Sequence, residues 1–311
     1  MGTDMTNGLK KAVKRPLNAF KAWQRRYLKI SLGNRVFAHK AEYRSDSENG
    51  KYGAVVTNAL RSQKAFDNFK RKRAYRRILE HVSRAQGADY LRIVLARDDG
   101  LVQAATRTVF QSDEVGNPIK YPYEGMQQPL SPTTLRYLKV ASDIRGLFGD
   151  KIDRVAEIGC GYGGQTLVND QLLKINSATL FDLPFVNELI RKYLNSMLMN
   201  GAYKVTTINE ALPENYDLVI SNYAFSELPS VLQLAYVRKV VANARCGYLT
   251  MNSGLGGERS VGKLSLQQLQ DLLPSFEIFE EEPLTSEFNY IIVWGHDREF
   301  AARHLTPKRL A

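Results

Sequence analysis

A glycine-rich segment in the middle of the chain has the composition of a nucleotide-binding loop. Residues 154–158 read as a short, mostly apolar strand, and four glycines follow within six residues, at Gly159, Gly161, Gly163 and Gly164. Glycine lets the backbone bend tightly and approach a ligand closely, and a doubly wound sheet places that ligand at the carboxyl end of its first strand. The spacing departs from the dinucleotide fingerprint G-x-G-x-x-G, and no Lys-Ser/Thr pair of a P-loop follows.

Two carboxylates accompany this loop. Glu157 precedes the glycines, and Asp182 ends the second predicted strand, where it can accept hydrogen bonds from both hydroxyls of a ribose. The pattern E-x-G-x-G-x-G followed by that acid resembles the class I S-adenosylmethionine (SAM) methyltransferases, and the glycine spacing argues against an NAD enzyme. The resemblance implies SAM as cofactor, S-adenosylhomocysteine (SAH) as product, and these cofactor-binding residues: Glu157, Gly159, Gly161, Tyr162, Gly163, Gln165, Asp182, Leu183, Ser221 and Asn222.

Further stretches narrow the resemblance. They are SPTTLRY at 131–137, EIGCGYGGQ at 157–165, YDLVISNYAFSEL at 216–228, GYLTMN at 247–252 and YRRILEHV at 75–82. Together they resemble a family of sugar O-methyltransferases that decorate surface glycans, over roughly residues 64–295. Cys160 departs from the pattern, because a glycine is more often expected there. The resemblance implies a saccharide or nucleotide-sugar acceptor, without naming the sugar.

Methyl transfer to a sugar hydroxyl needs alignment and a base, because the donor is activated and the hydroxyl is a poor nucleophile. Glu227 follows the fourth predicted strand and is the first candidate base, with a helix-start carboxylate as its structural alternative. His81 is the second candidate, and His296 is a third that fits a surface position better. His39 and His304 lie in segments too poorly defined for either to be favoured as the base. The predicted sugar-binding residues are Tyr121, Tyr123, Arg136, Tyr137, Asn222 and Asn252.

Two other chemistries are disfavoured. A hard cation would need carboxylates after strands four and five, but those positions read Ser221-Asn222 and Met251-Asn252, so we expect no metal. The N-P-P-Y motif of nucleobase N-methyltransferases is replaced by Ser221-Asn222-Tyr223-Ala224. This weighs against an exocyclic amine as acceptor.

The pattern from residue 152 onward predicts an open α/β sheet, Rossmann-like, with helices between the first five strands and an antiparallel edge. Ser131 and Pro132 begin a preceding helix that runs towards Gly149. Residues 111–132 read as a lid or long loop. The predicted strands are Arg154–Ile158, Ala178–Phe181, Lys204–Ile208, Tyr216–Ser221, Gly247–Met251, Phe276–Phe279 and Asn289–Trp294, and the predicted helices are Gln165–Leu173, Pro184–Met199, Leu228–Ala244 and Ser265–Leu273.

The positive charge lies in the first third of the chain. Residues 1–100 hold 23 Lys and Arg against 9 Asp and Glu, whereas residues 101–311 hold 20 against 23. The densest run is 70–77, on what reads as one basic helix from Phe66 to Val82; another such helix is expected around Phe20, Trp23 and Tyr27. Either could contact a phosphate backbone, an anionic membrane surface or an acidic polysaccharide, or simply face solvent, and the second could instead dock on its own domain.

Composition bounds the remaining possibilities. With 311 residues, 44% hydrophobic and 24% charged, the chain is ordinary for a globular protein. We expect neither a transmembrane helix nor a secretory signal. The two cysteines favour a reducing cytoplasm, where the basic first third of the chain could contact the inner face of the membrane. The expected divisions are a basic, partly mobile segment at 1–60, a helical cap and lid at 61–150, the SAM-binding domain at 151–298 and a tail at 299–311.

Three functions fit these patterns. The first is a SAM-dependent sugar O-methyltransferase, and the second is an RNA methyltransferase that grips phosphates with the basic third, although nucleic acid is not the favoured partner. The third is a non-catalytic binding module, which the intact Glu157, glycine loop and Asp182 argue against. The oligomeric state is left open by the sequence.

Overall fold

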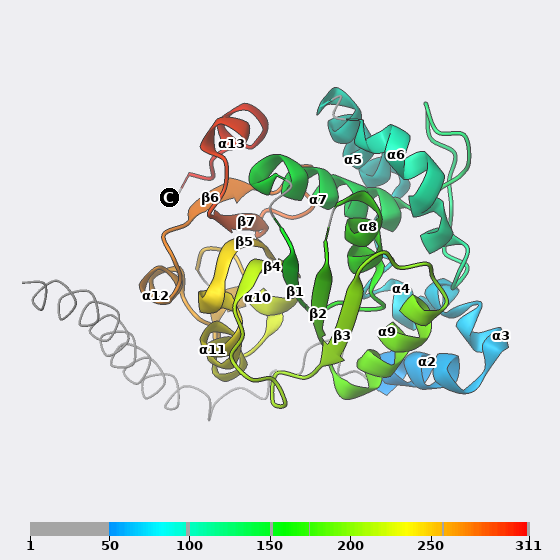
Figure 1. The fold of residues 1–311 in the computed structure, drawn as a ribbon, viewed down its shortest axis with the longest axis horizontal. Helices are drawn as coiled ribbons and strands as arrows, with labels where there is room; N and C mark the ends of the chain where they lie inside the picture. The colour runs from blue at the N-terminus through cyan, green and yellow to red at the C-terminus, as the bar shows by residue number, and fades with distance from the viewer. Residues whose placement is uncertain (1–49, 98–99, 150–151, 174, 257, 310–311) are drawn as a thin grey trace, which may run out of the picture.

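A seven-stranded mixed sheet forms the centre of the molecule (Figure 1). The computed structural model describes residues 50–97, 100–149, 152–173, 175–256 and 258–309. The strand order is β3-β2-β1-β4-β5-β7-β6. Strands β1 to β5 run parallel, and β7 is antiparallel to both of its neighbours. The strands are β1 Arg154–Ile158, β2 Ser177–Phe181, β3 Ala202–Thr206, β4 Tyr216–Asn222, β5 Ala244–Met251, β6 Glu277–Glu280 and β7 Tyr290–Trp294.

This order confirms the Rossmann-like fold of the class I methyltransferases and its antiparallel edge. The chain leaves β1, fills one half of the sheet, and returns through β4 to fill the other half. The carboxyl ends of β1 and β4 therefore diverge at the centre of the sheet, which is where open α/β sheets bind ligands. Every polar residue that follows one of these strands is brought to the same edge.

Helices cover the two faces of the sheet, with bounds close to the expected ones. They are α8 Gly164–Leu172, α9 Pro184–Asn195, α11 Ser230–Lys239 and α12 Leu266–Leu272. The expectation of a helix in every connection of the first five strands is wrong for residues 207–215. This segment is too short, and Glu210 accepts hydrogen bonds from the backbone and hydroxyl of Thr207, which closes a turn instead.

The long helix α7, Pro132–Phe148, begins where the capping residues predicted. The Ser131 hydroxyl accepts a hydrogen bond from the Thr134 N–H, and Pro132 occupies the first turn. Gly149 ends the helix with a left-handed φ of 64°. Most of α7 is buried, because it packs against α5 (Arg84–Arg97), α8 and α13 (Arg298–His304).

The segment from 66 to 82 is not the single amphipathic helix that the apolar stripe suggested. It breaks into the end of α3 (Gln63–Phe66), the 3-10 turn η2 (Phe69–Arg71) and α4 (Arg73–Arg76). Lys70 is the physical reason, because its side chain turns inward and its Nζ donates to the Ser112 carbonyl oxygen at 2.6 Å. Residues 90–95, an apolar run whose sequence fits either a helix or a buried strand, belong to α5.

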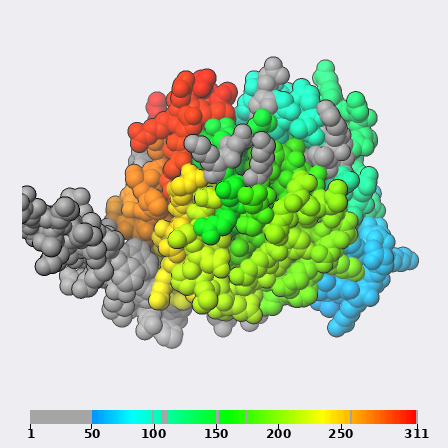
Figure 2. Space-filling model, viewed as in Figure 1, coloured from blue at the N-terminus to red at the C-terminus, as the bar shows by residue number. Residues whose placement is uncertain are grey.

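Helices α2 (Gly50–Arg61), α3 and α4 form a lobe beside the β3 half of the sheet (Figures 1 and 2), and α2 crosses the expected boundary at residue 60. The Lys192 ammonium of α9 donates to the Ala59 carbonyl oxygen at 2.8 Å and lies 4.6 Å from the centre of the Phe66 ring. Tyr52 packs edge-on against Phe185, 6.1 Å between ring centres. The lobe is thus fastened to the helix that follows β2.

The remaining described elements are short. They are α6 Leu101–Thr108, η3 Val109–Asp113, α10 Ala224–Glu227, η4 Val241–Asn243 and η5 Glu258–Ser260. Residues 114–131 form a loop without a long helix or strand, joined by one bridge between Tyr121 and Leu130. Within the described part of the chain, no helix combines the length and the apolar character needed to cross a membrane. The expected helix around Phe20, Trp23 and Tyr27, and His39, lie outside the described residues.

Candidate active site

The glycine loop, residues 159–164, has the tight geometry that its sequence predicted. Gly159, Gly161 and Gly163 have φ values of 75°, 62° and 89°, a region that side chains rarely adopt. A Cβ on Gly159 would lie 2.0 Å from the Cβ of Ala224, so the loop also packs directly on the segment after β4. Gly163 caps the start of α8, whose first N–H groups face the carboxyl edge of the sheet.

Asp182 lies beside this loop, at the end of β2. One carboxylate oxygen accepts the Gly161 N–H at 2.9 Å, and the other accepts the N–H of Leu183 at 2.7 Å. Burial raises the pKa of Asp182 to about 6, and these backbone hydrogen bonds oppose that rise. The loop and the acid that the sequence predicted to act together are therefore in contact, and Leu183 is placed next to them.

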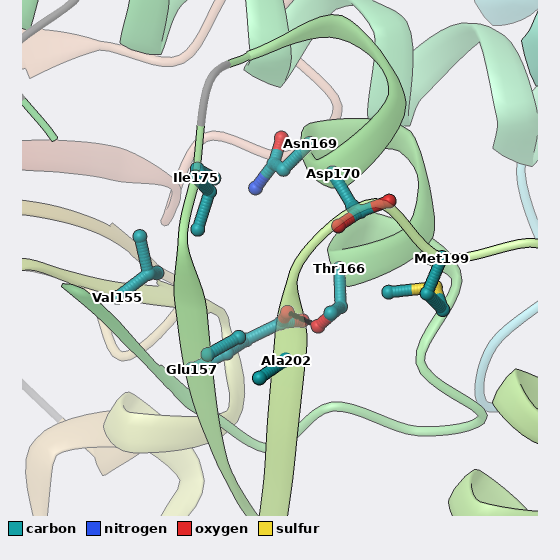
Figure 3. A pocket seen from close by; sticks show the side chains of 9 residues that line it. Val155, Glu157, Thr166, Asn169, Asp170, Ile175, Met199 and Ala202 are labelled. Carbon is teal, nitrogen blue, oxygen red and sulfur yellow. Dashed lines mark hydrogen bonds between the residues drawn. The ribbon is translucent and has the colours of Figure 1, made fainter. Parts of the chain in front are cut away.

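Glu157 points the other way, beneath α8 (Figure 3). Its carboxylate accepts a hydrogen bond from the Thr166 hydroxyl, and burial raises its pKa to about 8. The two side chains line a small cavity with room for about one water molecule. The carboxylate therefore supports the packing of α8 on β1, in a space too small for a cofactor.

Tyr162 and Gln165, two more predicted cofactor residues, are placed in the core. The Tyr162 ring is fully buried and packs edge-on against Tyr193, 4.9 Å between centres, with the Lys70 ammonium 4.1 Å from its centre. Gln165 donates to the Tyr137 carbonyl oxygen at 3.1 Å. Lys70 belongs to the basic run of the sequence, but burial lowers its pKa to about 8 and removes it from the surface.

Ser221 and Asn222 end β4 as expected, with different roles in the packing. The fully buried Ser221 hydroxyl donates to the Ile158 carbonyl oxygen and accepts the Phe225 N–H, both at 3.0 Å. It therefore ties the ends of β1 and β4 together. Asn222 is half-buried, and its amide donates to the side-chain oxygen of Gln165 at 3.4 Å.

Glu227 and Asn252, predicted from separate strands, meet at the carboxyl edge. The Asn252 amide donates to a Glu227 carboxylate oxygen at 2.8 Å. The Ser226 hydroxyl lies 2.7 Å from the other side-chain atom of Asn252, its Oδ1, and 2.6 Å from the Tyr223 carbonyl oxygen. This group connects the end of β4 to the end of β5.

His81 lies in the segment between α4 and α5. Its Nδ1 is 3.1 Å from the Ile78 carbonyl oxygen, which can only accept, so Nδ1 carries the proton and Nε2 keeps its lone pair. The residue as a whole is exposed, but desolvation of its ring, helped by the nearby Arg136 guanidinium, lowers the pKa of His81 to about 4. At neutral pH the imidazole is therefore uncharged and able to accept a proton.

A buried polar group near His81 was missed by the sequence reasoning. The Tyr223 hydroxyl donates to Glu281, which follows β6, and the Tyr223 ring lies 5.8 Å from the Arg136 guanidinium. Tyr90 of α5 also contributes to this cluster, through a hydrogen bond with Tyr223. The available signal was the position of Tyr223 and Glu281, each directly after a strand.

The predicted sugar-binding aromatics do not form one platform. Tyr121 lies 5.8 Å from the Arg84 guanidinium, and the Tyr123 hydroxyl donates to the Arg84 carbonyl oxygen at 3.4 Å. Tyr137 is buried beneath the glycine loop, where a Cβ on Gly164 would lie 2.6 Å from its ring. Only Arg136 joins the Tyr223 cluster.

His296 and His304 lie away from this edge. His296 follows β7, and β7 is antiparallel, so its end pairs with the beginning of β5 at the amino edge of the sheet. Its Nε2 is 3.8 Å from Glu277. His304 packs on Phe300 within α13, 4.5 Å between ring centres. In the described ranges, no three His, Cys, Asp or Glu side chains are grouped so that they could hold a metal ion.

Comparison with known proteins gives distant structural likenesses. No protein-family model and no curated protein matches the sequence. The mitomycin 7-O-methyltransferase MmcR is 12% identical with a TM-score of 0.38, over 92% of this chain and 98% of MmcR. A SAM-dependent methyltransferase from Leishmania major is 17% identical with a TM-score of 0.36, over 50% of this chain and 68% of its own.

A third solved structure, the pyocyanin biosynthetic protein PhzM, is 15% identical with a TM-score of 0.37. Its alignment covers 52% of this chain and 56% of PhzM, so the chain spans little more than half of that protein. The strand order of the sheet, rather than these alignments, establishes the fold.

Proposed function

We propose that the protein is a SAM-dependent methyltransferase that methylates a sugar hydroxyl. The observation that carries this proposal is the contact of Asp182 with Gly161 at the carboxyl edge of the sheet. It supports a donor site in which the glycine loop approaches the methionine part of SAM and the carboxylate receives the ribose hydroxyls. The family resemblance of the sequence supports the sugar acceptor.

The first test is donor binding, measured by titration calorimetry with SAH. We expect the full chain to bind SAH, and Asp182→Ala to bind it about tenfold to a hundredfold more weakly, because a hydrogen bond to a charged group is lost. Glu188→Ala, an exposed carboxylate on the following helix, is the matched control and should bind as the wild type does. Failure of the wild type to bind SAH would remove the proposal.

Two groups compete for the role of base, and their surroundings favour His81. Its Nε2 has a lone pair at neutral pH, whereas the Glu227 carboxylate already accepts the Asn252 amide and lies near Lys263. We therefore propose His81 as the general base, with Glu227 and Asn252 orienting sugar hydroxyls. Asn222, at the end of β4, would contribute to the same surface.

The acceptor test uses radiolabelled SAM with two pools, nucleotide sugars with glycan fragments in one and total RNA in the other. Label in the saccharide pool that falls about 100-fold or more in His81→Asn supports the proposed base. Loss of label in Glu227→Gln but not in His81→Asn would instead assign the base to Glu227. Absence of saccharide label would remove the sugar proposal.

RNA methylation remains the second candidate, because part of the basic run is on the surface. Arg71, Lys72, Arg73, Arg76 and Arg77 are exposed. An RNA enzyme would use them against phosphates, so binding would weaken steeply with salt. Replacing Arg73, Arg76 and Arg77 by Glu should then abolish RNA labelling. Saccharide labelling unaffected by the same changes would favour the sugar reaction.

A further inference from the structure

One buried arginine stands unpaired among paired neighbours. Arg97 and Lys139 each bind the buried Asp143 carboxylate at 2.7 Å. Arg136 lies one turn before Lys139 on the same helix and is only 6% exposed. Its Nε is enclosed without a hydrogen-bond partner, and Glu80 acts on the guanidinium electrostatically without a hydrogen bond to it. Of the two buried basic groups on α7, Lys139 therefore has an ion pair with Asp143, whereas Arg136 has Glu80 nearby but no ion pair or hydrogen bond with it.

Such an arrangement is costly, because a charge removed from water needs hydrogen bonds and an opposite charge. Arginine cannot escape this cost by losing its proton. A buried, unpaired guanidinium is therefore expected where something outside the chain supplies the missing negative group. Arg136 occupies such a position, in the cluster at the carboxyl edge of the sheet.

Two aromatic rings lie beside the guanidinium, and the Glu281 carboxylate close by is engaged with other groups. The Tyr137 and Tyr223 rings lie 5.5 Å and 5.8 Å from its carbon. Tyr223 adopts φ of 70°, a strained conformation for a non-glycine residue. The carboxylate nearest to Tyr223, that of Glu281, is already occupied by the Tyr223 hydroxyl and by Thr285 and Asn289.

Two titratable neighbours complete the local charge. Burial raises the pKa of Glu80 to about 7, so this carboxyl is partly protonated at neutral pH, and its Oε1 has no hydrogen-bond partner. His81 is neutral, in part because Arg136 is positive. Neither group makes a hydrogen bond to Arg136. Glu80 and Glu281 thus contribute negative charge to the cluster, but the Arg136 guanidinium itself is left without a hydrogen bond to either of them beside the proposed base.

We infer that Arg136 forms an anion subsite that binds a carboxylate or phosphate group carried by the acceptor. The guanidinium fork matches both groups geometrically, and the Tyr137 and Tyr223 rings lie beside it. The inference deepens the proposed function and rests on it for the identity of the acceptor: the sugar would be a uronic acid, a sugar phosphate or a nucleotide sugar. The sugar hydroxyl would then lie near His81, the neighbour of Arg136 on the cap.

The test is a binding measurement that does not depend on turnover. Thermal unfolding of the full chain is followed with glucose, glucuronate, glucose 6-phosphate and inorganic phosphate, at constant ionic strength. We expect at least one of the charged probes to raise the Tm of the wild type and glucose to leave it unchanged. In Arg136→Met the shift should disappear, while in Arg303→Met, which removes an exposed arginine of α13, it should remain.

The melting point of Arg136→Met without ligand is a second readout. Because the native guanidinium is unpaired, its removal should leave the Tm equal to or above that of the wild type. Arg97→Met, which removes one of the two cations bound to the Asp143 carboxylate, should lower the Tm. SAH binding by Arg136→Met, measured by calorimetry, shows whether the donor site is intact and so separates this inference from the proposed function.

The outcomes divide cleanly. A shift with glucuronate assigns a carboxylate, and a shift with the two phosphates assigns a phosphate, and both support the subsite when Arg136→Met abolishes them. Equal shifts in the wild type and Arg136→Met, no shift with any charged probe, or a collapsed Arg136→Met fold would each overturn it. In a positive case, the KM for the charged acceptor should rise about tenfold to a hundredfold in Arg136→Met.

Discussion

At the scale of single residues, His81 shows how loss of water and a neighbouring charge keep an imidazole uncharged. The loss of water and the nearby Arg136 lower the pKa of the imidazole to about 4, and the Ile78 carbonyl oxygen holds the proton on Nδ1. A general base must be deprotonated to act. The same two features that disfavour the charged imidazole therefore keep Nε2 available.

The pH dependence of the rate follows from this pKa. As pH falls through about 4, the imidazole gains a proton and kcat/KM should fall, whereas an ordinary histidine would lose activity through about 6.5. At saturating SAM, where protonation of Asp182 near pH 6 does not limit donor binding, we expect kcat/KM for the acceptor to stay level from neutral pH down to about 5. An inflection near 6.5 that disappears in His81→Asn would contradict the lowered pKa. Identical profiles in the two proteins would show that His81 is not the base.

Glu157 gives a prediction on stability. Its ordinary pKa is 4.5 and its folded pKa is about 8, so between these values folding takes up a proton and stability falls as pH rises. Glu157→Gln lacks this titration. It should therefore be more stable than the wild type at about pH 9, by a few kcal/mol, and lose that advantage at about pH 4.

Urea unfolding at several pH values measures this difference, with Glu188→Gln, an exposed carboxylate on α9, as the control. A constant difference between Glu157→Gln and the wild type at every pH would argue against the buried, protonated carboxyl. The hydrogen bond from Thr166 is compatible with glutamine, because the amide oxygen can accept it.

At the scale of elements, the glycine loop depends on both conformation and space. Gly159→Ala places a side chain at φ of 75° and its Cβ 2.0 Å from Ala224. Gly125 has φ of 78° with nothing within 4 Å of an added Cβ. Gly125→Ala should therefore cost about 1–2 kcal/mol from conformation alone, and Gly159→Ala about 1–3 kcal/mol more from the clash.

Denaturant unfolding and SAH calorimetry together check this comparison. We expect Gly159→Ala to weaken SAH binding as well, since Ala224 must move and the loop with it, while Gly125→Ala binds normally. Equal losses of stability in the two variants would mean that Ala224 and the segment after β4 can move to relieve the clash at little cost.

The elements were predictable where local chemistry determines them. β1 has the predicted bounds, because a short buried strand ends at glycines. Helix α7 begins after Ser131, because the capping hydroxyl and the proline of the first turn are adjacent in the sequence, as Ser131 and Pro132. The segment 66–82 was not predictable in this way. Lys70 turns inward to a carbonyl 42 residues away, and no pattern within the segment reports such a contact.

The same distinction applies to the candidate site. Asp182 and Gly161, or Glu227 and Asn252, could be paired in advance because parallel strands bring their carboxyl ends to one edge. The contact of Tyr223 with Glu281 depends on where β6 falls in the sheet order, across β7 and β5. Sequence separation alone could not bring these two side chains together.

At the scale of the whole molecule, the cap and the sheet meet at the glycine loop. A Cβ on Gly161 would lie 2.9 Å from the Leu79 side chain, so the cap packs directly on the loop. Tyr52 of α2 stacks on Tyr75, 5.4 Å between ring centres, and burial, with a contribution from Asp182, raises its pKa. A ligand between loop and Asp182 would therefore touch both halves of the molecule.

This arrangement predicts that donor binding suppresses local opening of residues 50–82. Hydrogen exchange of the full chain, measured with and without SAH, should slow in residues 50–82 as well as in residues 157–165, because ligand contacts suppress local opening of the elements they join. Helix α12 packs on the far half of the sheet and should exchange unchanged. Protection confined to the loop and Asp182 would mean that residues 50–82 do not respond to the donor. The packing of Leu79 on Gly161 would then stabilise the fold without taking part in donor binding.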